Sequence, residues 1–261
     1  MGGEDLAGLP DDDADLERRF GGLRRLYGEA AYARLRGLAV CVVGVGGVGS
    51  WAAEALARSG VARLVLIDLD HVSESNINRQ VQAVSPTVGQ AKVLALQERI
   101  ALIHPGCVVQ AVEAFVEPET WPQLLPGPVD VLIDACDQSR AKLALAAWGL
   151  GSGTPVVCVG AAGGKRLPHR VEVDDLATAT HDPLLASLRQ RLRRDHAAPR
   201  SGPIGLRCVF SRESVAAPQG DDCAVDGTLN CSGYGSSVTV TATFGMTAAA
   251  TAIETALARA L

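Results

Sequence analysis

The sequence predicts an α/β fold with a doubly wound, mostly parallel sheet, and three observations lead to it. Short apolar runs, typical of strands that are covered on both faces, recur through the first part of the chain. Helical patterns separate these runs, as in repeated strand–helix–strand units. The first run leads into the glycine-rich stretch "GVGGVG", which opens a helical pattern. Together these features predict a Rossmann-like sheet with helices before it and an extension after it.

The elements of this sheet can be assigned in chain order. Two short helical pieces are expected between Phe20 and Arg36. Five strands are expected at Ala39–Val43, Arg63–Ile67, Val108–Val112, Val129–Ile133 and Pro155–Val159. The helices between them are expected at Val48–Ala57, Val88–Ile103 and Arg140–Trp148.

The pattern changes after Gly164. "HRVEVDDL" is typical of a strand at a sheet edge, and "LRCVFSRE" predicts another strand. Between them, "DPLLASLRQRLRRDH" predicts a basic helix that begins near Asp182. Its leucines form one apolar stripe at spacings of three and four. Ser214 to Gly235 is rich in Gly, Pro, Ser and Asp, which predicts a mobile loop.

The segment from Val238 to Leu257 is about as long as a membrane span, which needs roughly 20 apolar residues. It contains six threonines and Glu254, however, so a buried helix near a subunit interface is favoured over membrane insertion. Its alternating threonines leave a strand open as well, because threonine favours strands and alanine favours helices.

Composition limits the organisation and the location of the protein. The 261 residues carry a net charge of −5, so overall charge does not indicate nucleic-acid binding. We expect an acidic tail at 1–16 and one domain at 17–261, with a nucleotide-binding half at about 38–164 and a substrate and dimer half at about 165–261. Seven cysteines without any C-x-x-C pair, and no signal peptide, indicate reduced thiols in the cytoplasm and no structural zinc.

The glycine loop alone does not identify its ligand. Gly44, Gly46 and Gly49 satisfy G-x-G-x-x-G, and Asp68 follows the second strand. Such a loop most often binds NAD or FAD, or simply packs a tight turn. Arg79 and Lys92, which follow the second strand, are not needed for hydride transfer but suit the charge of a triphosphate.

Carboxylates near the end of the fourth strand extend this argument. Asp134 and Asp137 lie where ligands bind in such sheets, and Asp137 is the better candidate for magnesium. Each residue also has a structural alternative: Asp137 as the N-cap of the next helix, and Arg79 as a partner of Glu74. Their combined order on one sheet favours a triphosphate site.

The stretches "GVGGVGSWAAEALARSGVARLVLIDLD", "SNINRQ", "VGQAK" and "DACD" resemble the ubiquitin-activating-enzyme-like superfamily, whose members adenylate a carboxylate with ATP and magnesium. The resemblance is closer to its tRNA threonylcarbamoyladenosine dehydratase branch, through "RRFGGLRRLYGEAA", "GAAGG", "HDPLLASLRQRLRRD", "CVFSRE" and "CSGYGSSVTVTATFG". It implies a homodimer and a C-terminal helix. The ATP-binding residues that it implies are Gly44, Gly46, Gly47, Gly49, Asp68, Asn76, Asn78, Arg79, Lys92 and Asp137.

This resemblance implies an enzyme that adenylates the threonyl carboxylate of threonylcarbamoyladenosine in tRNA, with Arg79, Lys92 and Asp137 as its catalytic residues. The modified nucleoside would then cyclise with net loss of water. The alternative is adenylation of the C-terminal glycine of a ubiquitin-like sulfur carrier. Many relatives place an ATP-reaching arginine of the partner subunit where this chain has Gly22, with Arg19 or Arg24 as substitutes.

Two further sets of candidates concern the partners. Lys165, Arg166, Arg189 and Arg193 are expected to contact the tRNA backbone, although a solvated charged face is the alternative. Cys231 is the better of two weak candidates, with Cys223, for a reactive thiol that would serve a sulfur-relay partner. Ring closure itself needs no thiol.

Overall fold

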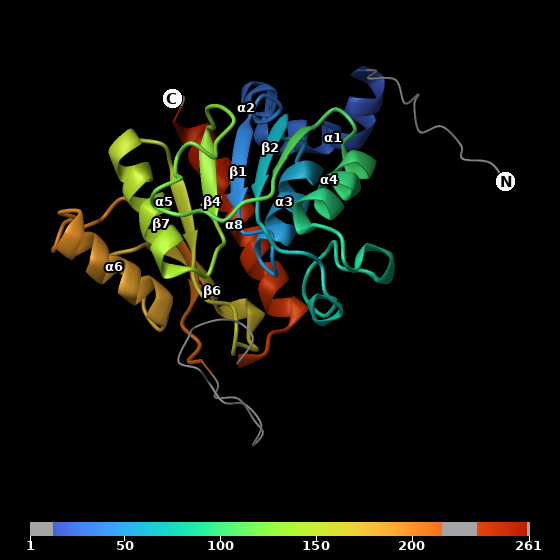
Figure 1. Cartoon of the computed structure of the whole chain (residues 1–261). Helices are drawn as coiled ribbons and strands as arrows, with labels where there is room; N and C mark the ends of the chain where they lie inside the picture. Colours follow the sequence, from blue (N-terminus) through green and yellow to red (C-terminus); the bar gives the residue numbers. More distant parts are fainter. Residues whose placement is uncertain (1–12, 216–233, 260–261) are drawn as a thin grey trace.

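A seven-stranded sheet forms the centre of the computed structural model, which describes residues 13–215 and 234–259. Its order is β3-β2-β1-β4-β5-β7-β6, and all neighbouring strands are parallel except β6 and β7 (Figure 1). The strands are β1 (Ala39–Val43), β2 (Arg63–Ile67), β3 (Val108–Val112), β4 (Val131–Asp134), β5 (Val156–Val159), β6 (Val171–Asp175) and β7 (Arg207–Ser211). The prediction of a doubly wound, mostly parallel sheet is confirmed.

Successive strand residues divide between two hydrophobic cores, because side chains alternate between the faces of a sheet. Val40 and Val42 of β1 face one core, whereas Cys41 and Val43 face the other. Helices cover both faces, which explains why the strands are apolar throughout. The first core includes α3 (Gly49–Arg58), α4 (Lys92–Ile103) and α8 (Val238–Ala258), and the second includes α5 (Ser139–Ser152) and α6 (Pro183–Asp195).

The two N-terminal helices, α1 (Asp13–Tyr27) and α2 (Glu29–Leu35), lie at the edge of the sheet where β1 begins (Figure 1). Gly28 joins them with φ of +80°, a conformation that residues with a side chain rarely adopt. The carboxyl ends of the parallel strands lie at the opposite edge. The N-terminal helices are therefore remote from the ligand-binding edge of their own chain.

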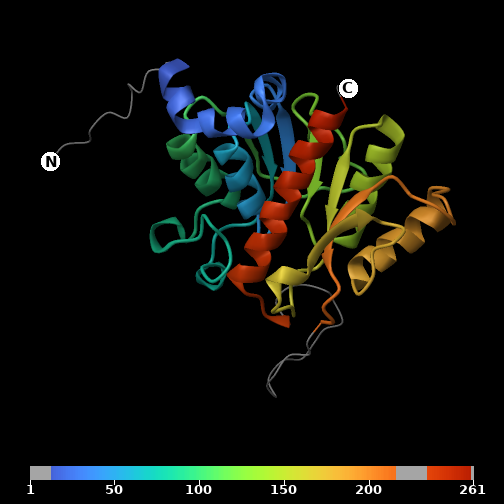
Figure 2. The same cartoon turned by 180° about the vertical axis from the view of Figure 1, so that it is seen from behind.

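The C-terminal segment is a helix, so the strand alternative is wrong. The Ser237 side chain caps its first turn, and Figure 2 shows α8 crossing one face of the sheet beside α3. Several threonines satisfy their hydroxyls within the helix; for example, Thr251 Oγ1 donates to Thr247 O at 2.8 Å. Gly245 permits close packing, since a Cβ there would lie 2.5 Å from Val48 O. Among the described helices, none has the length and apolarity required for a membrane span.

Most of the remaining boundaries agree with the sequence to within a few residues, with two clear corrections. α1 begins at Asp13, seven residues before the expected Phe20 and within the segment 1–16 that was expected to be an acidic tail. α4 begins at Lys92 and not at Val88, because Gly89 adopts φ of +90° and breaks any helix before it. β6 is an edge strand, as predicted. Most of the expected loop between Ser214 and Gly235 lies outside the described residues.

Candidate active site

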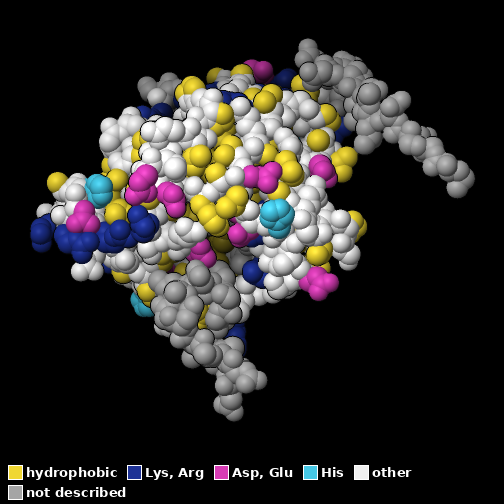
Figure 3. Space-filling model, viewed as in Figure 1, with side chains coloured by type: hydrophobic (Ala, Val, Ile, Leu, Met, Phe, Trp, Pro, Cys, Tyr) yellow, Lys and Arg dark blue, Asp and Glu magenta, His cyan; other side chains and the backbone are white. Residues whose placement is uncertain are grey.

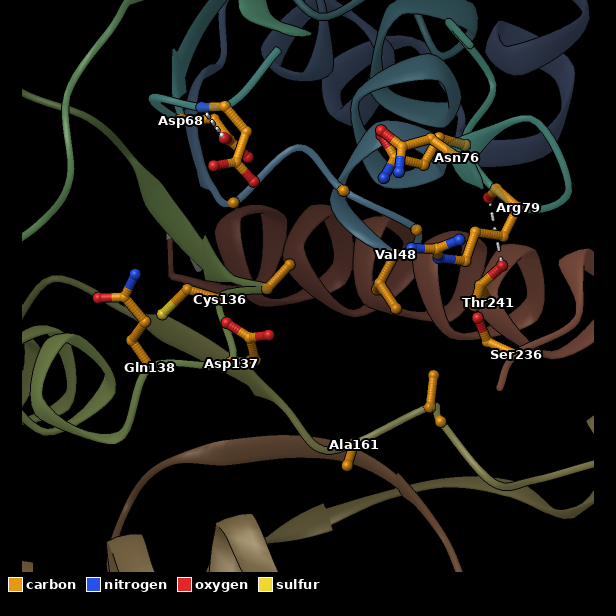
Figure 4. Close-up of a pocket in the computed structure, with 18 of the residues that line it drawn as sticks. Val48, Asp68, Asn76, Arg79, Cys136, Asp137, Gln138, Ala161, Ser236 and Thr241 are labelled. Atoms are coloured by element: carbon orange, nitrogen blue, oxygen red, sulfur yellow. Dashed lines mark hydrogen bonds between the residues drawn. The ribbon is translucent and has the colours of Figure 1, made fainter. Parts of the chain in front are cut away.

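A cavity of about 900 Å³ opens where β1, β2, β4 and β5 end, at the edge of the sheet opposite α1 and α2. This is the position at which ligands bind in open α/β sheets. Figure 4 shows its polar lining: Asp68 and Asn76 lie on one side, Ala161 on the other, and Asp137 between them.

The glycine loop forms one wall of this cavity. Gly44 has φ of +81°, and a Cβ there would approach Cys136 N to 2.9 Å. Gly49 begins α3, and its Cβ would lie only 1.8 Å from Gly44 O. Both positions therefore require glycine, which leaves the loop backbone and the start of α3 open to a phosphate. Gly46 and Gly47 line the cavity between them.

Asp68 ties this loop to the end of β2. Its carboxylate accepts hydrogen bonds from Val45 N at 2.8 Å and from Asp70 N at 2.9 Å. Burial raises the pKa of the Asp68 carboxyl above its usual value, and the positive charge of Lys92 opposes this shift. The Asp68 side chain thus orders the glycine loop, and its carboxylate also lines the cavity.

Lys92 lies at the start of α4, and its side chain is almost fully buried. Its Nζ lies 2.7 Å from Asp70 Oδ2, while the Asp70 side chain is 55% exposed. Asp70 was not among the predicted site residues, although the acidic ending "DLD" of the second strand was a visible signal. The ammonium of Lys92 therefore reaches the cavity already paired with a solvent-accessible carboxylate.

Asn76, Asn78 and Arg79 come from one short segment after β2. Asn76 Oδ1 accepts from Ser73 N at 3.1 Å and caps the 3₁₀ turn Glu74–Asn76. The Arg79 guanidinium donates to Ser75 O at 2.6 Å and to Asn78 Oδ1 at 2.9 Å. Figure 4 shows Arg79 beside Thr241 of α8, whose hydroxyl donates to Arg79 O at 3.4 Å.

The hydrogen bonds of Arg79 bear on its alternative role as an ion-pair partner of Glu74. In the described part of the chain, Arg79 forms no ion pair with Glu74. The structure brings Arg79 to the same cavity as Lys92 and Asp137.

Asp134 and Asp137 differ sharply in environment. Asp134 is fully buried, and Lys142 Nζ lies 2.8 Å from its Oδ2. Lys142 also donates to Val159 O at 3.0 Å, which joins the ends of β4 and β5. Asp137 is exposed to the cavity, and its carboxylate makes no hydrogen bond with other described residues. Gln138 is the N-cap residue of α5, so Asp137 does not occupy that position.

Of the two carboxylates that follow β4, Asp137 is therefore the one that is open to a ligand. Asp134 is engaged on both oxygens, because Cys136 Sγ donates to its Oδ1 at 2.9 Å. Burial and the adjacent Asp134 carboxylate raise the pKa of the Cys136 thiol well above its usual value, so that thiol stays protonated. Lys142 was not found from sequence, where it is a single lysine in the apolar helix "AKLALAA".

The basic residues expected to contact tRNA do not form a free cluster. Lys165 is buried and its Nζ donates to Ser211 O at 2.9 Å and to Glu213 O at 3.3 Å. Burial lowers the pKa of Lys165, and the carboxylates of Asp182 and Glu213 oppose this effect. The structure therefore removes Lys165 from any surface patch, because two backbone carbonyls hold its ammonium inside the protein.

The arginines of α6 are also partly engaged. Arg189 donates to Leu176 O at 3.0 Å and to Ala179 O at 2.7 Å, and Arg193 Nε donates to Pro199 O at 3.0 Å. These bonds go to neutral carbonyls, and neither arginine forms an ion pair within the described residues. Figure 3 shows basic side chains gathered over α6, and Arg166 is exposed elsewhere.

The other candidate residues from the sequence lie far from the cavity or outside the described residues. Arg19 donates to Ile103 O at 3.1 Å, and Arg24 pairs with Glu17 at 2.8 Å, both near the edge of the sheet opposite the cavity. Cys223 and Cys231 lie outside the described residues. Within 13–215 and 234–259, no group of three or more His, Cys, Asp and Glu side chains could hold a metal ion.

The chain is similar to known proteins over nearly its whole length. The model of the ThiF family matches residues 19–260. The chain belongs to the ThiF family. It is 43% identical over 93% of its length to tRNA threonylcarbamoyladenosine dehydratase of Escherichia coli, and covers 95% of that relative. The structure of that Escherichia coli enzyme in complex with ATP matches with a TM-score of 0.87 at 41% identity, over 97% of this chain and 98% of the other.

A relative with lower coverage bears on the two functions suggested by the sequence. The molybdopterin-synthase adenylyltransferase of Salmonella typhimurium is 35% identical over only 41% of this chain and 43% of its own length. The similarity to the dehydratase, in contrast, includes the second half with α6, β7 and α8. The similarity to the dehydratase therefore extends over nearly the whole chain, whereas the similarity to the adenylyltransferase covers less than half of it.

Proposed function

We propose that this chain adenylates the threonyl carboxylate of threonylcarbamoyladenosine in tRNA with ATP, and that the activated nucleoside then cyclises with net loss of water. The observation that carries this proposal is the match over nearly the whole chain to a dehydratase whose structure contains ATP. The carrier-protein alternative has weaker support, because the similarity to the molybdopterin-synthase adenylyltransferase covers less than half of the chain.

The wall formed by the glycine loop suits the nucleotide. Backbone amides of Gly46 and Gly47 at the start of α3 would hold phosphate oxygens, since a helix N-terminus favours anions. Asp68 would accept the ribose hydroxyls. Asn76, Asn78 and Arg79 would contact the outer phosphates, where the arginine fork can bind two oxygens at once.

Lys92 would neutralise charge at the α-phosphate. Its ammonium is already directed into the cavity by Asp70, at 2.7 Å. Because Asp70 is more than half exposed, its carboxylate can return to water when a phosphate oxygen replaces it. Lys92 can therefore change partners without leaving a buried charge unpaired.

Asp137 fits a magnesium ion bound together with ATP. A single free carboxylate beside phosphate oxygens is the usual protein contribution to such a site. When bound, the metal would withdraw charge from the phosphate oxygens. Asp134 does not fit this role, since Lys142 and Cys136 occupy its oxygens.

The reaction needs alignment and charge neutralisation from the protein. A carboxylate oxygen of the substrate forms a bond to the α-phosphorus, and the bond to the β-phosphate oxygen breaks, which releases pyrophosphate. The neighbouring carbamoyl group then attacks the acyl carbon and loses a proton, and AMP leaves. Both groups belong to one molecule, so the second step has a high effective molarity. Arg79 and Lys92 stabilise the charge that develops in the first step.

Pyrophosphate release from ATP with modified tRNA tests this function. Asp137→Ala and Lys92→Ala should abolish it while the fold persists, because both side chains lie at the cavity and outside the two cores. Asp130→Ala, at the other edge of the sheet, serves as a control for general damage. Pyrophosphate release with a ubiquitin-like carrier protein, and none with modified tRNA, would instead support the alternative.

Arg166, Arg189 and Arg193 are our candidates for contacts to the tRNA backbone. Arg166→Ala/Arg193→Ala should weaken tRNA binding and lower its salt dependence by roughly one unit per lost phosphate contact, with ATP affinity unchanged. Arg189 is left out of this test because its bonds to Leu176 and Ala179 give it a structural role as well. A double variant with the parent's affinity at every salt concentration would exclude this surface.

The remaining proposals concern assembly, location and thiols. We propose a cytoplasmic homodimer, whose mass in solution can be measured by light scattering. An arginine of α1 would reach an ATP site only in the partner subunit, because α1 and the cavity lie at opposite edges of the sheet (Figure 1). Cys231→Ser should retain the cyclisation activity, since ring closure needs no thioester. Any role of Cys231 toward a sulfur-relay partner would be separate from this reaction.

A further inference from the structure

The side of the cavity away from the glycine loop is built from two segments that are distant in sequence. The turn after β5 contributes Ala161, Ala162 and Gly163, and the first turn of α6 contributes Pro183 and Leu184. We call these five residues the second wall. Its side chains are small or apolar, in contrast to the charged groups around the glycine loop.

Asp182 joins the two segments of the second wall. Its Oδ2 accepts a hydrogen bond from Ala161 N at 2.8 Å, and its Oδ1 accepts one from Leu185 N at 3.0 Å. The second bond is the ordinary N-cap of α6. The first bond is not needed for capping, because it reaches across to the turn that follows β5.

The surroundings show that this bridge is closely fitted. Asp182 is only 4% exposed, so both of its oxygens depend on these backbone donors. A Cβ at Gly160 would lie 2.2 Å from Asp182 Oδ2. Glycine at that position therefore makes room for the carboxylate.

The second wall faces the place where the acceptor must enter. Figure 4 shows Ala161 across the cavity from Asp68, with Asp137 between them. If ATP lies along the glycine loop, an acceptor that attacks in line must approach its α-phosphorus from another side of the cavity. α6 begins at the second wall and carries its basic residues toward the surface, so a nucleotide held near α6 could extend its modified base inward.

We propose that the second wall binds the threonylcarbamoyl group of the substrate, and that Asp182 is the positioning residue that holds this wall in place. This inference rests on the proposed function and deepens it, because it assigns the subsite for the acceptor. Asp182 itself does not touch the reacting atoms. It acts by fixing the turn at Ala161 relative to the first turn of α6.

Asp182→Ser separates this role from helix capping. Serine is as good an N-cap as aspartate, so α6 should persist, but one short hydroxyl cannot hold both Leu185 N and Ala161 N. Asp195→Asn is the matched control, because Asp195 is an exposed residue at the other end of α6 that pairs with Arg194. The measured quantity is the ratio of affinities for tRNA with and without the threonylcarbamoyl group, together with the Kd for ATP.

We expect the parent and Asp195→Asn to prefer the modified tRNA. In Asp182→Ser this preference should fall several-fold, because the turn at Ala161 loses the bond that fixes it against α6, while the affinities for ATP and for unmodified tRNA stay unchanged. Asp182→Ser with the parent's preference would overturn this inference alone. A parent that neither discriminates the two tRNAs nor releases pyrophosphate with the modified one would overturn the proposed function, and this inference with it.

Discussion

Replacement of Lys142 by methionine removes one partner of a fully buried ion pair beneath the active site. In the native protein Lys142 Nζ donates to Asp134 Oδ2 at 2.8 Å, to Val159 O at 3.0 Å and to Asp134 O at 3.3 Å. Methionine has a similar length, so it fills the space but offers no donor. The Asp134 carboxylate would then be left charged and buried without its counter-ion.

The expected cost follows from this geometry. Both side chains are 0% exposed, so solvent does not screen the pair or replace the lost partner. Loss of one member of such a pair costs about 3–5 kcal/mol of unfolding free energy. For a domain of this size each kcal/mol corresponds to about 2–4 °C, so Tm should fall by about 6–20 °C.

A second variant identifies the cause. Lys142→Met/Asp134→Asn removes the stranded charge and keeps an acceptor for Cys136, so it should recover much of the lost stability. Denaturant unfolding and calorimetry measure both variants. A single variant within about 1 kcal/mol of the parent, or a double variant no more stable than the single one, would refute the reasoning.

The pH dependence gives an independent check. Burial is the largest single influence and lowers the pKa of Lys142, but the charge and hydrogen bond of Asp134, together with the neighbouring Cys136 and Cys158, raise it by more in sum. A raised lysine pKa gives stability that is complete below the unfolded pKa, about 10.4, and is lost only as the pH rises through the folded value. The contribution of the Lys142 ammonium to the parent's stability should therefore stay constant across the neutral range and be lost only in strongly alkaline solution.

Three further predictions follow from the same structure. Asp70→Asn should raise the affinity for ATP a few-fold, since Lys92 no longer has to leave a carboxylate; calorimetric titration that shows weaker binding would contradict the proposed exchange of partners. Burial raises the pKa of Asp68, so on acidification the affinity for ATP should begin to fall at a higher pH than an ordinary aspartate would cause. Asp68→Asn should bind ATP weakly at every pH and lack this pH dependence. Lys165→Met should lower Tm while tRNA affinity stays unchanged, because Lys165 bonds to Ser211 O and Glu213 O inside the protein. A loss of tRNA affinity without a loss of stability would instead return Lys165 to the residues proposed to contact tRNA.

Local sequence patterns predicted the types of most secondary-structure elements, although they left the segment that forms α8 open between helix and strand, and they also predicted the place of the nucleotide site. Strand periodicity and the spacing of Gly44, Gly46 and Gly49 act over a few residues, so they are readable without a structure. Asp68, Arg79 and Lys92 follow the second strand in a fixed order, and parallel strands bring their carboxyl ends to one edge. The sequence alone could therefore place these residues near one another.

The tertiary structure decided which of the charged residues are available. Asp134 and Asp137 are three positions apart, yet the first is fully buried and paired with Lys142 while the second stays open to the cavity. Lys165 looked like a surface cation and lies among backbone carbonyls instead. Burial and pairing depend on neighbours from distant parts of the chain, and no local periodicity encodes them. For the same reason Asp182 marked only the start of a helix in the sequence, whereas in the folded protein it also holds the turn after β5.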